Sequence, residues 1–410
     1  MRSSMRKPEL LIPASSLEVL KTAVIFGADA VYIGGEAFGL RAKAKNFSME
    51  EMRAGIAFAH EHGVKVYVTA NILAHNYDLA GVEEYFKELK EIRPDALIIA
   101  DPGVFRIAKR VCPEIEIHIS TQANNTNYET YRFWHELGAK RVVSARELSL
   151  KEIRELRANI PEELEIETFV HGAMCISYSG RCLLSNYFTG RDANQGACTH
   201  PCRWKYAVVE ETRPGQYLPV YENERGTYIF NSKDLCMIGH IPDLMEAGID
   251  SFKIEGRMKT ALYVATVART YRKAIDDYLE SPAKYEENMP WYRQQIASCT
   301  YRQFTTGFFY GKPDESTQIY DSNTYVKEYT YLGIVEEVRD GACRIEQRNK
   351  FSVGEEIEIM KPDGRNVLAT VLSIADEEGV SMESAPHPQQ KLDVRLSGMA
   401  ERYDLLRRKE

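Results

Sequence analysis

Long apolar runs are absent from the sequence. No stretch approaches the roughly 20 consecutive apolar residues that a membrane-spanning helix needs. The N-terminal residues Met1 to Pro8 are basic and polar, and the apolar stretch after them is too short for the core of a secretory signal peptide. We therefore expect a cytoplasmic protein with no membrane partner. The hydrophobic fraction of 44% is ordinary for a globular chain and excludes general disorder.

Two common hydrolase motifs are also missing. His60 and His62 flank a single glutamate, so the H-E-x-x-H spacing of zinc proteases does not occur, and the G-x-S-x-G motif of serine hydrolases is absent. A cysteine protease would need a histidine base beside its thiol, and His171 and His200 are the candidates near the cysteines. The residues themselves thus give peptidase chemistry little support.

An excess of basic residues is lacking as well. The chain has 52 Lys and Arg against 60 Asp and Glu, a formal net charge of -8. This balance argues against sequence-independent binding to nucleic acid, although a local basic groove would not show in the sum.

Cysteine is present and unevenly placed. The chain has eight: Cys112, Cys175, Cys182, Cys198, Cys202, Cys236, Cys299 and Cys343. Five fall within residues 175–236, far more than an even spread would place there. Because a disulfide framework is not expected in a reducing compartment, the clustering predicts metal binding or catalysis. We expect the other three to be ordinary buried residues.

The spacing of the clustered cysteines bears on the metal. Only Cys198 and Cys202 are as close as the thiols of a zinc knuckle, and no second tight pair accompanies them. Four thiolates gathered from irregular spacings suit an iron–sulfur cluster better. Zinc, or cysteines that are catalytic or merely buried, remain alternatives because soft thiolate ligands alone do not decide between metals.

The first 260 residues alternate strand-like and helical patterns. The eight strand candidates are residues 9–13, 30–34, 65–70, 96–101, 116–121, 141–144, 165–170 and 251–256. They are apolar or β-branched and have the length of buried parallel strands. Ser48 and Ser149 each precede a glutamate by three residues, the capping-box pattern of a helix start. The alternation favours an α/β fold, a (β/α)8 TIM-like barrel, over an open doubly wound sheet.

The seventh and eighth strand candidates are much farther apart than any other neighbouring pair. The intervening insertion, residues 171–240, holds the clustered cysteines. In a barrel, a segment that follows a strand emerges at the C-terminal face, where active sites lie. The sequence therefore predicts that the cysteine-rich insertion lies at the active site.

The domain boundaries follow from changes of pattern. We expect the barrel with its insertion to occupy residues 1–285 and a linker packed on it to occupy 286–325. Residues 326–410 change to a period of two, with a turn signal at Pro362 to Gly364, which predicts a small antiparallel β-barrel. We interpret the basic end, residues 405–409, as a frayed tail.

Charged residues at the ends of two predicted strands are candidates for catalysis. Lys253, Glu255 and Arg257 alternate, so they share one face of the eighth strand. Charges inside the barrel or at its mouth are costly unless they are paired or used. Glu167 and His171 lie at the end of the seventh strand and complete the catalytic candidates.

Other polar residues are candidates for substrate binding. Asn71 and Gln122 follow strands, although such residues can simply cap loops. Arg41 lies in a basic loop that lines the same mouth or is solvated. Arg191 belongs to a group of cations around the cysteines. Tyr178 belongs to the aromatic residues interleaved with them, which either stack unpaired bases or form a core around the metal.

Residues 167–185 resemble the signature of the peptidase U-32 (collagenase-like) family. The signature reads E-x-F-x-x-G-(S/A)-(aliphatic or Met)-C-x4-G-x-C-x-(aliphatic)-S. Its fixed positions are satisfied by Glu167, Phe169, Gly172, Ala173, Met174, Cys175, Gly180, Cys182, Leu184 and Ser185. The resemblance extends through the predicted barrel, and the last part of the chain looks like the family's C-terminal domain.

The resemblance implies an activity. Several members of this family are oxygen-independent hydroxylation proteins that hold a 4Fe-4S cluster on four cysteines. The branch with a barrel and a small β-domain converts the wobble uridine in the tRNA anticodon loop to 5-hydroxyuridine, with prephenate as co-substrate, for whose carboxylates the fork of Arg257 is suited. A partner subunit from a related family is a further partner that the resemblance implies. The implied cluster ligands are Cys175, Cys182, Cys198 and Cys236, with Cys202 as the surplus thiol, although some relatives use its position. The alternatives are a peptidase and a non-catalytic, metal-stabilised RNA-binding protein.

Overall fold

The computed structural model describes residues 6–35, 46–175, 177–191, 193, 197–204, 207–209, 217–219, 232–299, 303–313, 317 and 328–410. The chain forms two compact units. The first comprises Met1–Leu20, Asp29–Met258 and Arg302–Thr324, and the second comprises Lys21–Ala28, Lys259–Tyr301 and Tyr325–Glu410. Within the part of the chain that is described, no helix is both long and apolar enough to cross a membrane.

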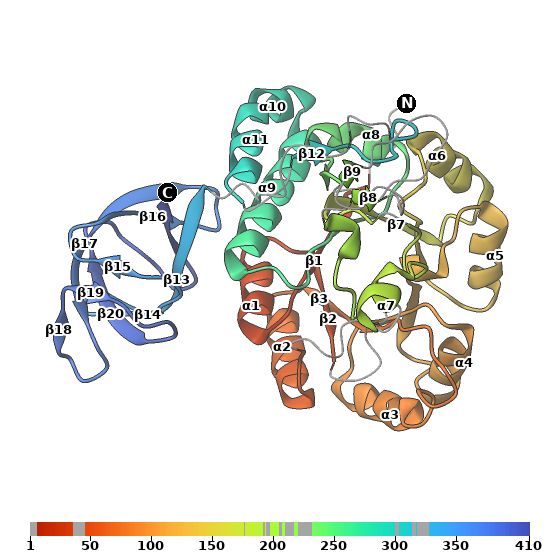
Figure 1. Ribbon diagram of the computed structural model, residues 1–410, viewed down its shortest axis with the longest axis horizontal. Helices are drawn as coiled ribbons and strands as arrows, with labels where there is room; N and C mark the ends of the chain where they lie inside the picture. Colours follow the sequence, from red (N-terminus) through yellow and green to blue (C-terminus); the bar gives the residue numbers. More distant parts are fainter. Residues whose placement is uncertain are drawn as a thin grey trace. The chain divides into compact units, whose positions relative to one another are not determined.

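The first unit is built on a closed barrel of eight parallel strands (Figure 1). They are β1 Glu9–Pro13, β2 Ala30–Gly34, β3 Lys65–Ala70, β4 Ala96–Ile99, β5 Glu116–Ile119, β6 Arg141–Val143, β7 Glu165–Gly172 and β11 Ser251–Ile254. Each strand pairs with the next in parallel register, and β11 pairs with both β1 and β7, which closes the barrel. The predicted (β/α)8 barrel is confirmed, with every strand at its expected place.

Helices follow the strands along the chain. They are α1 Leu17–Ile25, α2 Met49–Glu61, α3 Val82–Ile92, α4 Pro102–Val111, α5 Tyr128–Glu136 and α6 Leu150–Asn159. Ser48 and Ser149 form the two predicted capping boxes, each with the glutamate three residues later. Each box satisfies helix N–H groups that have no partner within the helix.

The insertion after β7 adds short elements to the barrel. They are α7 Leu184–Thr189, the 3-10 helix η3 Pro201–Arg203, the antiparallel pair β8 Ala207–Val209 and β9 Tyr217–Pro219, and β10 Asp234–Cys236. Strand β10 runs antiparallel to the end of β7, with Cys236 opposite His171. Strand β12, Phe304–Thr305, lies beside β10. The 3-10 helix η4 Ile238–His240 and α8 Ile241–Glu246 then lead into β11.

The second unit contains three helices and an antiparallel barrel. The helices are α9 Ala261–Glu280, α10 Pro282–Glu287 and α11 Met289–Ala297. The long strands are β13 Tyr329–Arg339, β14 Ala342–Glu346, β16 Glu356–Met360, β17 Asn366–Ala375, β20 Lys391–Leu396 and β21 Leu405–Lys409. They close in the order β16-β21-β13-β14-β20-β17 through pairing of β16 with β17. The predicted C-terminal β-barrel is confirmed; β15 Phe351–Ser352, β18 Ser381–Met382 and β19 Ser384–Ala385 are short additions to it.

The domain boundaries of the structure can be set beside those drawn from the sequence. The compact second unit takes in α9 to α11, whereas the sequence pattern assigned residues up to 285 to the barrel. The expected linker, residues 286–325, includes α11 and β12. Helix α9 is amphipathic with a wide buried face, and its partners lie partly in the β-barrel of its own unit.

The interpretation of residues 405–409 as a frayed tail is wrong. These residues form β21, which pairs with both β13 and β16. Leu405 and Leu406 are fully buried. The basic pattern was misleading because Arg407, although charged, is buried in an ion pair with Glu358.

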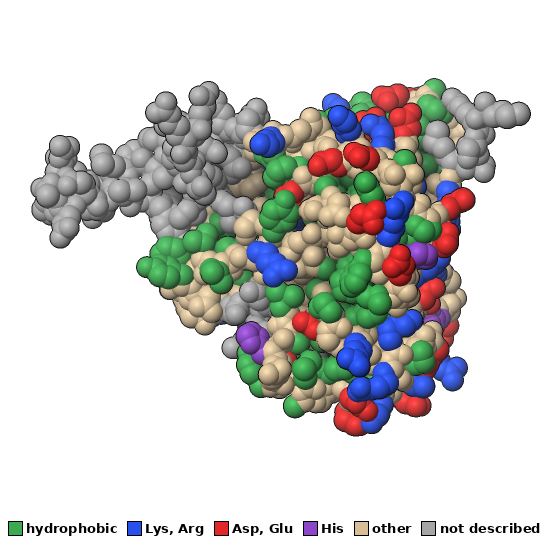
Figure 2. Space-filling model, turned by 90° about the vertical axis from the view of Figure 1, so that its right-hand side faces the viewer, with side chains coloured by type: hydrophobic (Ala, Val, Ile, Leu, Met, Phe, Trp, Pro, Cys, Tyr) green, Lys and Arg blue, Asp and Glu red, His purple; other side chains and the backbone are tan. Residues whose placement is uncertain are grey.

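One face of the molecule shows how the charge is distributed. Acidic and basic side chains are interspersed there around a group of hydrophobic side chains (Figure 2). The formal net charge of -8 therefore does not appear on that face as one acidic region. Mixed surfaces of this kind keep a protein soluble without a strong field of one sign.

Candidate functional site

A cavity of about 220 Å³ opens at the C-terminal ends of the barrel strands. Its inner wall consists of residues at or just after those ends: Tyr32, Thr69, Asn71, Ile98, Ser120, Thr121, Gln122, Arg146, Phe169, Lys253, Glu255 and Arg257. Its outer wall comes from the insertion and includes Cys175, Tyr178, Cys182, Cys198, His200 and Cys202. Enzymes of this architecture carry their active sites at this C-terminal face of the barrel.

The thiols of the insertion gather at this cavity. Cys175, Cys182 and Cys198, three of the four expected ligands, line it. So does Cys202, the expected surplus thiol, whereas Cys236 lies on β10 and is not part of the lining. All five are at least partly exposed. Which four would act together stays a prediction.

The thiols at the cavity are of the chemical type that binds an iron–sulfur cluster. Thiolates are the ligands of such clusters, and four thiols line one hollow. Among the described residues, no three His, Cys, Asp or Glu side chains are already arranged to hold a metal ion. The fit therefore rests on the chemistry of the side chains and on their shared cavity.

Arg146 connects the cysteines to the barrel. Its Nη1 lies 3.6 Å from the Cys175 sulfur and donates to the Ala173 carbonyl at 3.2 Å. Its Nη2 donates to Glu255 at 3.1 Å, and the guanidinium lies over the Phe169 ring, 4.1 Å from its centre. The sequence analysis missed Arg146. The signal was available, because this residue follows the sixth strand as the other candidates follow theirs.

Lys253 forms part of the cavity floor and is tied to a carboxylate beneath it. Its Nζ donates to Glu167 at 2.6 Å and lies 4.7 Å from the centre of the Tyr32 ring. Glu167 is fully buried and is not part of the cavity lining. These two catalytic candidates therefore have different places: Lys253 lines the cavity and can meet a ligand, and Glu167 holds Lys253 in place.

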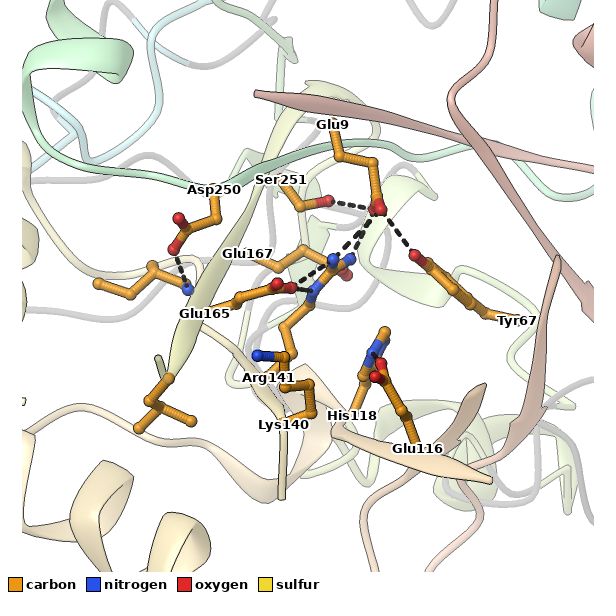
Figure 3. Close-up of polar contacts among 12 residues, drawn as sticks. Glu9, Tyr67, Glu116, His118, Lys140, Arg141, Glu165, Glu167, Asp250 and Ser251 are labelled. Atoms are coloured by element: carbon orange, nitrogen blue, oxygen red, sulfur yellow. Dashed lines mark hydrogen bonds and ion pairs between the residues drawn. The ribbon is translucent and has the colours of Figure 1, made fainter. Parts of the chain in front are cut away.

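Beneath the floor, the barrel interior is an ionic network centred on Arg141 (Figure 3). The Arg141 guanidinium contacts Glu9 at 2.6 Å, Glu165 at 2.6 Å and Glu167 at 3.0 Å. Tyr67 donates its hydroxyl to Glu9 at 2.6 Å. One buried guanidinium thus satisfies three carboxylates, which is the condition under which buried charge is tolerated.

The network fixes the ionisation of its members. Burial alone would raise the pKa of Glu167, but the charges of Lys253 and Arg141 hold it below its usual range. Burial also opposes ionisation of Glu9, and the charge and hydrogen bonds of Arg141 nevertheless lower its pKa to about 2. Both groups are therefore carboxylates at neutral pH, so Glu167 acts as a fixed anion rather than as a proton donor.

Arg257 is held by contacts with residues on β3 and after β2. Its guanidinium is buried, donates to Thr69 at 3.1 Å and reaches Asn46 at 3.4 Å. A Cβ at Gly34 would lie 2.2 Å from Nη1 of Arg257, so only glycine leaves room for it. Arg257 lines the cavity with a fixed orientation, as does Glu255 through its pairing with Arg146.

The remaining candidates are placed as follows. Asn71 and Gln122 line the cavity, and each is linked to Ser120 at 3.3 Å. His171 is buried, with its ring 5.9 Å from that of Phe304, and does not line the cavity. Arg191 is exposed and also lies off the lining. Arg41 lies outside the described residues.

The aromatic side chains of the insertion are exposed at the surface. Tyr187 is 83% exposed, and Tyr178, Phe188 and Trp204 are between 43% and 45% exposed. The rings of Tyr187 and Phe188 lie 5.2 Å apart, and those of Phe188 and Trp204 lie 6.1 Å apart. We call Tyr187, Phe188 and Trp204 the aromatic rim. These side chains do not form a closed core around the cysteines.

The fold and the site together describe a (β/α)8 barrel with a thiol-lined cavity at its C-terminal face. Residues 15–319 match the sequence model of Peptidase family U32, and residues 327–407 match that of the Peptidase family U32 C-terminal domain. The chain belongs to peptidase family U32, and the resemblance stated from residues 167–185 is confirmed.

Two of the similar proteins cover more than nine tenths of the chain. The chain is 42% identical to tRNA hydroxylation protein P1 of Bacillus subtilis (strain 168), over 95% of this chain and 92% of that one. It is 38% identical to tRNA hydroxylation protein P of Escherichia coli (strain K12), over 93% and 92%. It is 36% identical to the 23S rRNA 5-hydroxycytidine C2501 synthase of the same organism, over 68% of this chain and 41% of that one.

Proposed function

We propose that this protein is an RNA-modifying enzyme that hydroxylates a uridine of tRNA. The observation that carries the proposal is similarity along both units to relatives named tRNA hydroxylation proteins. The more distant relative named for 5-hydroxycytidine supports hydroxylation of a pyrimidine ring. The cavity at the C-terminal barrel face is where such a base would react.

The target is a single-stranded base, and the wobble uridine of the anticodon loop is the proposed one. An unpaired base can leave the stack and enter a cavity, whereas a base within an RNA helix is hidden in a deep, narrow groove. The aromatic rim supports this proposal, since exposed rings stack neighbouring unpaired bases. Exposed Arg181 and Arg191 lie in the same insertion and would contact phosphates.

The co-substrate that we propose is prephenate, a dicarboxylate. Three cationic side chains line the cavity: Arg146, Lys253 and Arg257. Arg257 is oriented by Thr69 and Asn46, and its planar guanidinium has the shape to bind an incoming carboxylate through two hydrogen bonds. Lys253 and Arg146 are already paired with Glu167 and Glu255 and would orient the ligand rather than neutralise it.

The cofactor that we propose is a 4Fe-4S cluster held by Cys175, Cys182, Cys198 and Cys236. Such a cluster supplies one-electron chemistry when it is bound. Arg146, beside the Cys175 sulfur, would stabilise that residue as a thiolate. Gly172, with a φ of +106°, lets the chain turn out of β7 toward Cys175 where a Cβ would lie 2.7 Å from the Glu255 carbonyl.

The metal content tests the cofactor. We expect iron and sulfide in stoichiometric amounts after anaerobic purification, and stoichiometric zinc without iron would overturn the assignment. Single Cys→Ala variants of all five cysteines identify the ligands. Loss of iron in Cys202→Ala with retention in Cys236→Ala would exchange those two residues in the ligand set.

Nucleoside mass spectrometry tests the function. tRNA from a deletion strain should lack 5-hydroxyuridine derivatives, and the wild-type gene, but not the Cys175→Ala gene, should restore them. Unchanged nucleosides in a strain with no second homologue would contradict the proposal. Casein or gelatin cleavage that is lost in Cys175→Ser but survives Cys198→Ala would instead favour the peptidase alternative, and RNA binding without modification would favour the non-catalytic one.

A further inference from the structure

The second unit contains a separate cavity, whose lining residues lie far along the chain from the clustered cysteines of residues 175–236. Its volume is about 480 Å³, and it lies between helix α11 and strands of the C-terminal barrel. Trp291 and Gln295 contribute to its wall from the helix, and Arg365, Asn366 and Arg407 contribute from the strands and the turn that joins β16 to β17. We call it the α11 cavity.

Two arginines are buried at the α11 cavity. Arg407 lines it, is 1% exposed, and lies with its guanidinium 4.1 Å from the centre of the Tyr329 ring. Its Nε pairs with Glu358 and its Nη1 donates to Ser298 at 3.1 Å. Arg269, on α9, is 2% exposed. Burial and the neighbouring charge of Arg407 lower the pKa of Arg269 to about 9.

Arg269 has no carboxylate partner among the described residues. Its Nη1 donates to the backbone carbonyls of Lys361 at 2.9 Å and Arg365 at 3.4 Å. Its Nη2 donates to the side-chain oxygens of Gln295 at 2.6 Å and Asn366 at 2.8 Å. Among the described residues its Nε has no hydrogen-bond partner, and its guanidinium lies 5.9 Å from the centre of the Trp291 ring. The charges of Glu358 and Asp363 act on Arg269 from a distance, but no described carboxylate contacts it, and a buried guanidinium without such a contact is costly in a protein interior.

The same hydrogen bonds make the cavity rich in donors. The amide oxygens of Gln295 and Asn366 accept hydrogen bonds from Arg269. The NH2 groups of the same side chains can donate hydrogen bonds to a ligand. Both residues line the cavity together with Arg365, Arg407 and the exposed Lys409. The acids of the wall are Glu358, which pairs with Arg407, and Glu328, and Arg365 pairs with Asp363 at 2.6 Å. A donor-rich, cationic cavity suits a ligand that only accepts hydrogen bonds, such as a phosphate.

We infer that the α11 cavity binds a phosphate group of a single-stranded segment of the tRNA substrate, with an adjacent base against Trp291. This inference rests on the proposed function and gives the substrate a second point of attachment. The indole of Trp291 at the wall distinguishes a nucleotide from a free anion, because stacking on an aromatic ring is sequence-tolerant. The amide groups would meet acceptors on the phosphate or the base edge.

Exposed residues of the cavity provide the first test, because their replacement spares the fold. In the full-length protein, Arg365→Ala and Lys409→Ala should each weaken tRNA binding and lower the slope of log Kd against log salt by about 1. Arg339→Ala, which removes a 72% exposed arginine of the same unit outside the cavity, is the matched control and should change neither quantity. Wild-type binding and slope in both cavity variants would overturn the inference.

Trp291 provides the second test, which does not depend on catalysis. A short single-stranded RNA should quench the tryptophan fluorescence of the wild-type protein, and Trp291→Phe should remove that part of the quenching. Quenching by inorganic phosphate but not by RNA would show an anion site without an RNA role and would overturn the inference. If the wild-type gene restores hydroxylation while these binding tests fail, the inference fails alone. If hydroxylation is never restored, the proposed function fails, and RNA quenching at Trp291 still decides whether the cavity binds RNA.

Discussion

Lys253 and Glu167 face each other across 2.6 Å on neighbouring strands, at the boundary between the cavity and the barrel interior. The lysine meets the cavity, while the glutamate is fully buried and is also held by Arg141. Lys253, whose charge a substrate would meet, is thereby linked to the buried ionic network around Arg141, which does not line the cavity. Function at the mouth and stability of the barrel therefore share residues.

Glu167→Gln should destabilise the protein strongly. The substitution leaves Lys253 and Arg141 buried beside a neutral amide, a loss of roughly 3–5 kcal/mol in the free energy of unfolding. Urea denaturation of the first unit would measure it. Glu84→Gln, which removes one side of an exposed ion pair with Lys87, is the control and should cost less than about 1 kcal/mol. Equal losses in the two variants would show that the buried network is not required.

Acid should destabilise the barrel through Glu9. Its pKa of about 2 in the folded state lies below the ordinary value of 4.5 expected for the unfolded chain. The stabilisation is thus complete above about pH 4.5 and is lost as the pH falls toward 2, because the unfolded state then binds the proton more readily. Glu9→Gln should reduce the slope of unfolding free energy against pH in this window, relative to the Glu84→Gln control. An unchanged slope would contradict the assignment.

His118 should add a second acid-sensitive step at higher pH. Its ring is 1% exposed, neither ring nitrogen has a hydrogen-bond partner among the described residues, and its Nε2 lies 3.7 Å from the Glu116 carboxylate. Burial, together with the charge of Arg141, lowers the pKa of His118, so the folded protein holds it neutral. Stability should fall as the pH drops below the unfolded value of about 6.5, where the unfolded histidine gains a proton. His118→Phe should remove that loss between pH 7 and pH 5, and a retained loss would assign it elsewhere.

Arg146→Lys should impair the reaction more than the fold. A lysine keeps the charge but cannot contact Ala173, Cys175 and Glu255 together, so the cavity wall loses its alignment. Hydroxylation per cluster-loaded enzyme should fall on the order of tenfold to a hundredfold. The iron content and the melting temperature should be measured beside the rate, because a variant that loses iron reports on the cysteines instead. Wild-type turnover would exclude a positioning role.

Removing the aromatic rim should weaken tRNA binding. Tyr187→Ala and Phe188→Ala should each cost about 1–3 kcal/mol of binding free energy if an unpaired base stacks there. The melting temperature should hardly change, because Tyr187 is 83% exposed and Phe188 is 43% exposed. Tyr77→Ala is the matched control, since Tyr77 is 71% exposed and belongs to a loop outside the insertion. A similar loss in the control would show a general surface effect.

Much of the fold follows from local patterns. All eight barrel strands lie where apolar runs predicted them, because strands buried on both faces are rich in apolar residues even where they also carry buried charges such as Arg141 and Glu167. The C-terminal barrel was foreseen except for β21, whose buried Arg407 hides the alternation expected of a strand. Arg146 was missed although it follows the sixth strand, because its contacts with Cys175 and Glu255 join residues that are distant along the chain and appear only in the fold.

The sequence by itself determined the family, the barrel and the clustering of five cysteines, because these depend on the order and periodicity of residues along the chain. Only the tertiary structure decided that Glu167 lies beneath Lys253 and that Cys202 joins Cys175, Cys182 and Cys198 at the cavity. It also brought Arg269 beside the α11 cavity, where it donates to the side-chain oxygens of Gln295 and Asn366. These relationships are contacts between residues that lie far apart along the chain. Their energies depend on burial, and burial exists only in the folded protein.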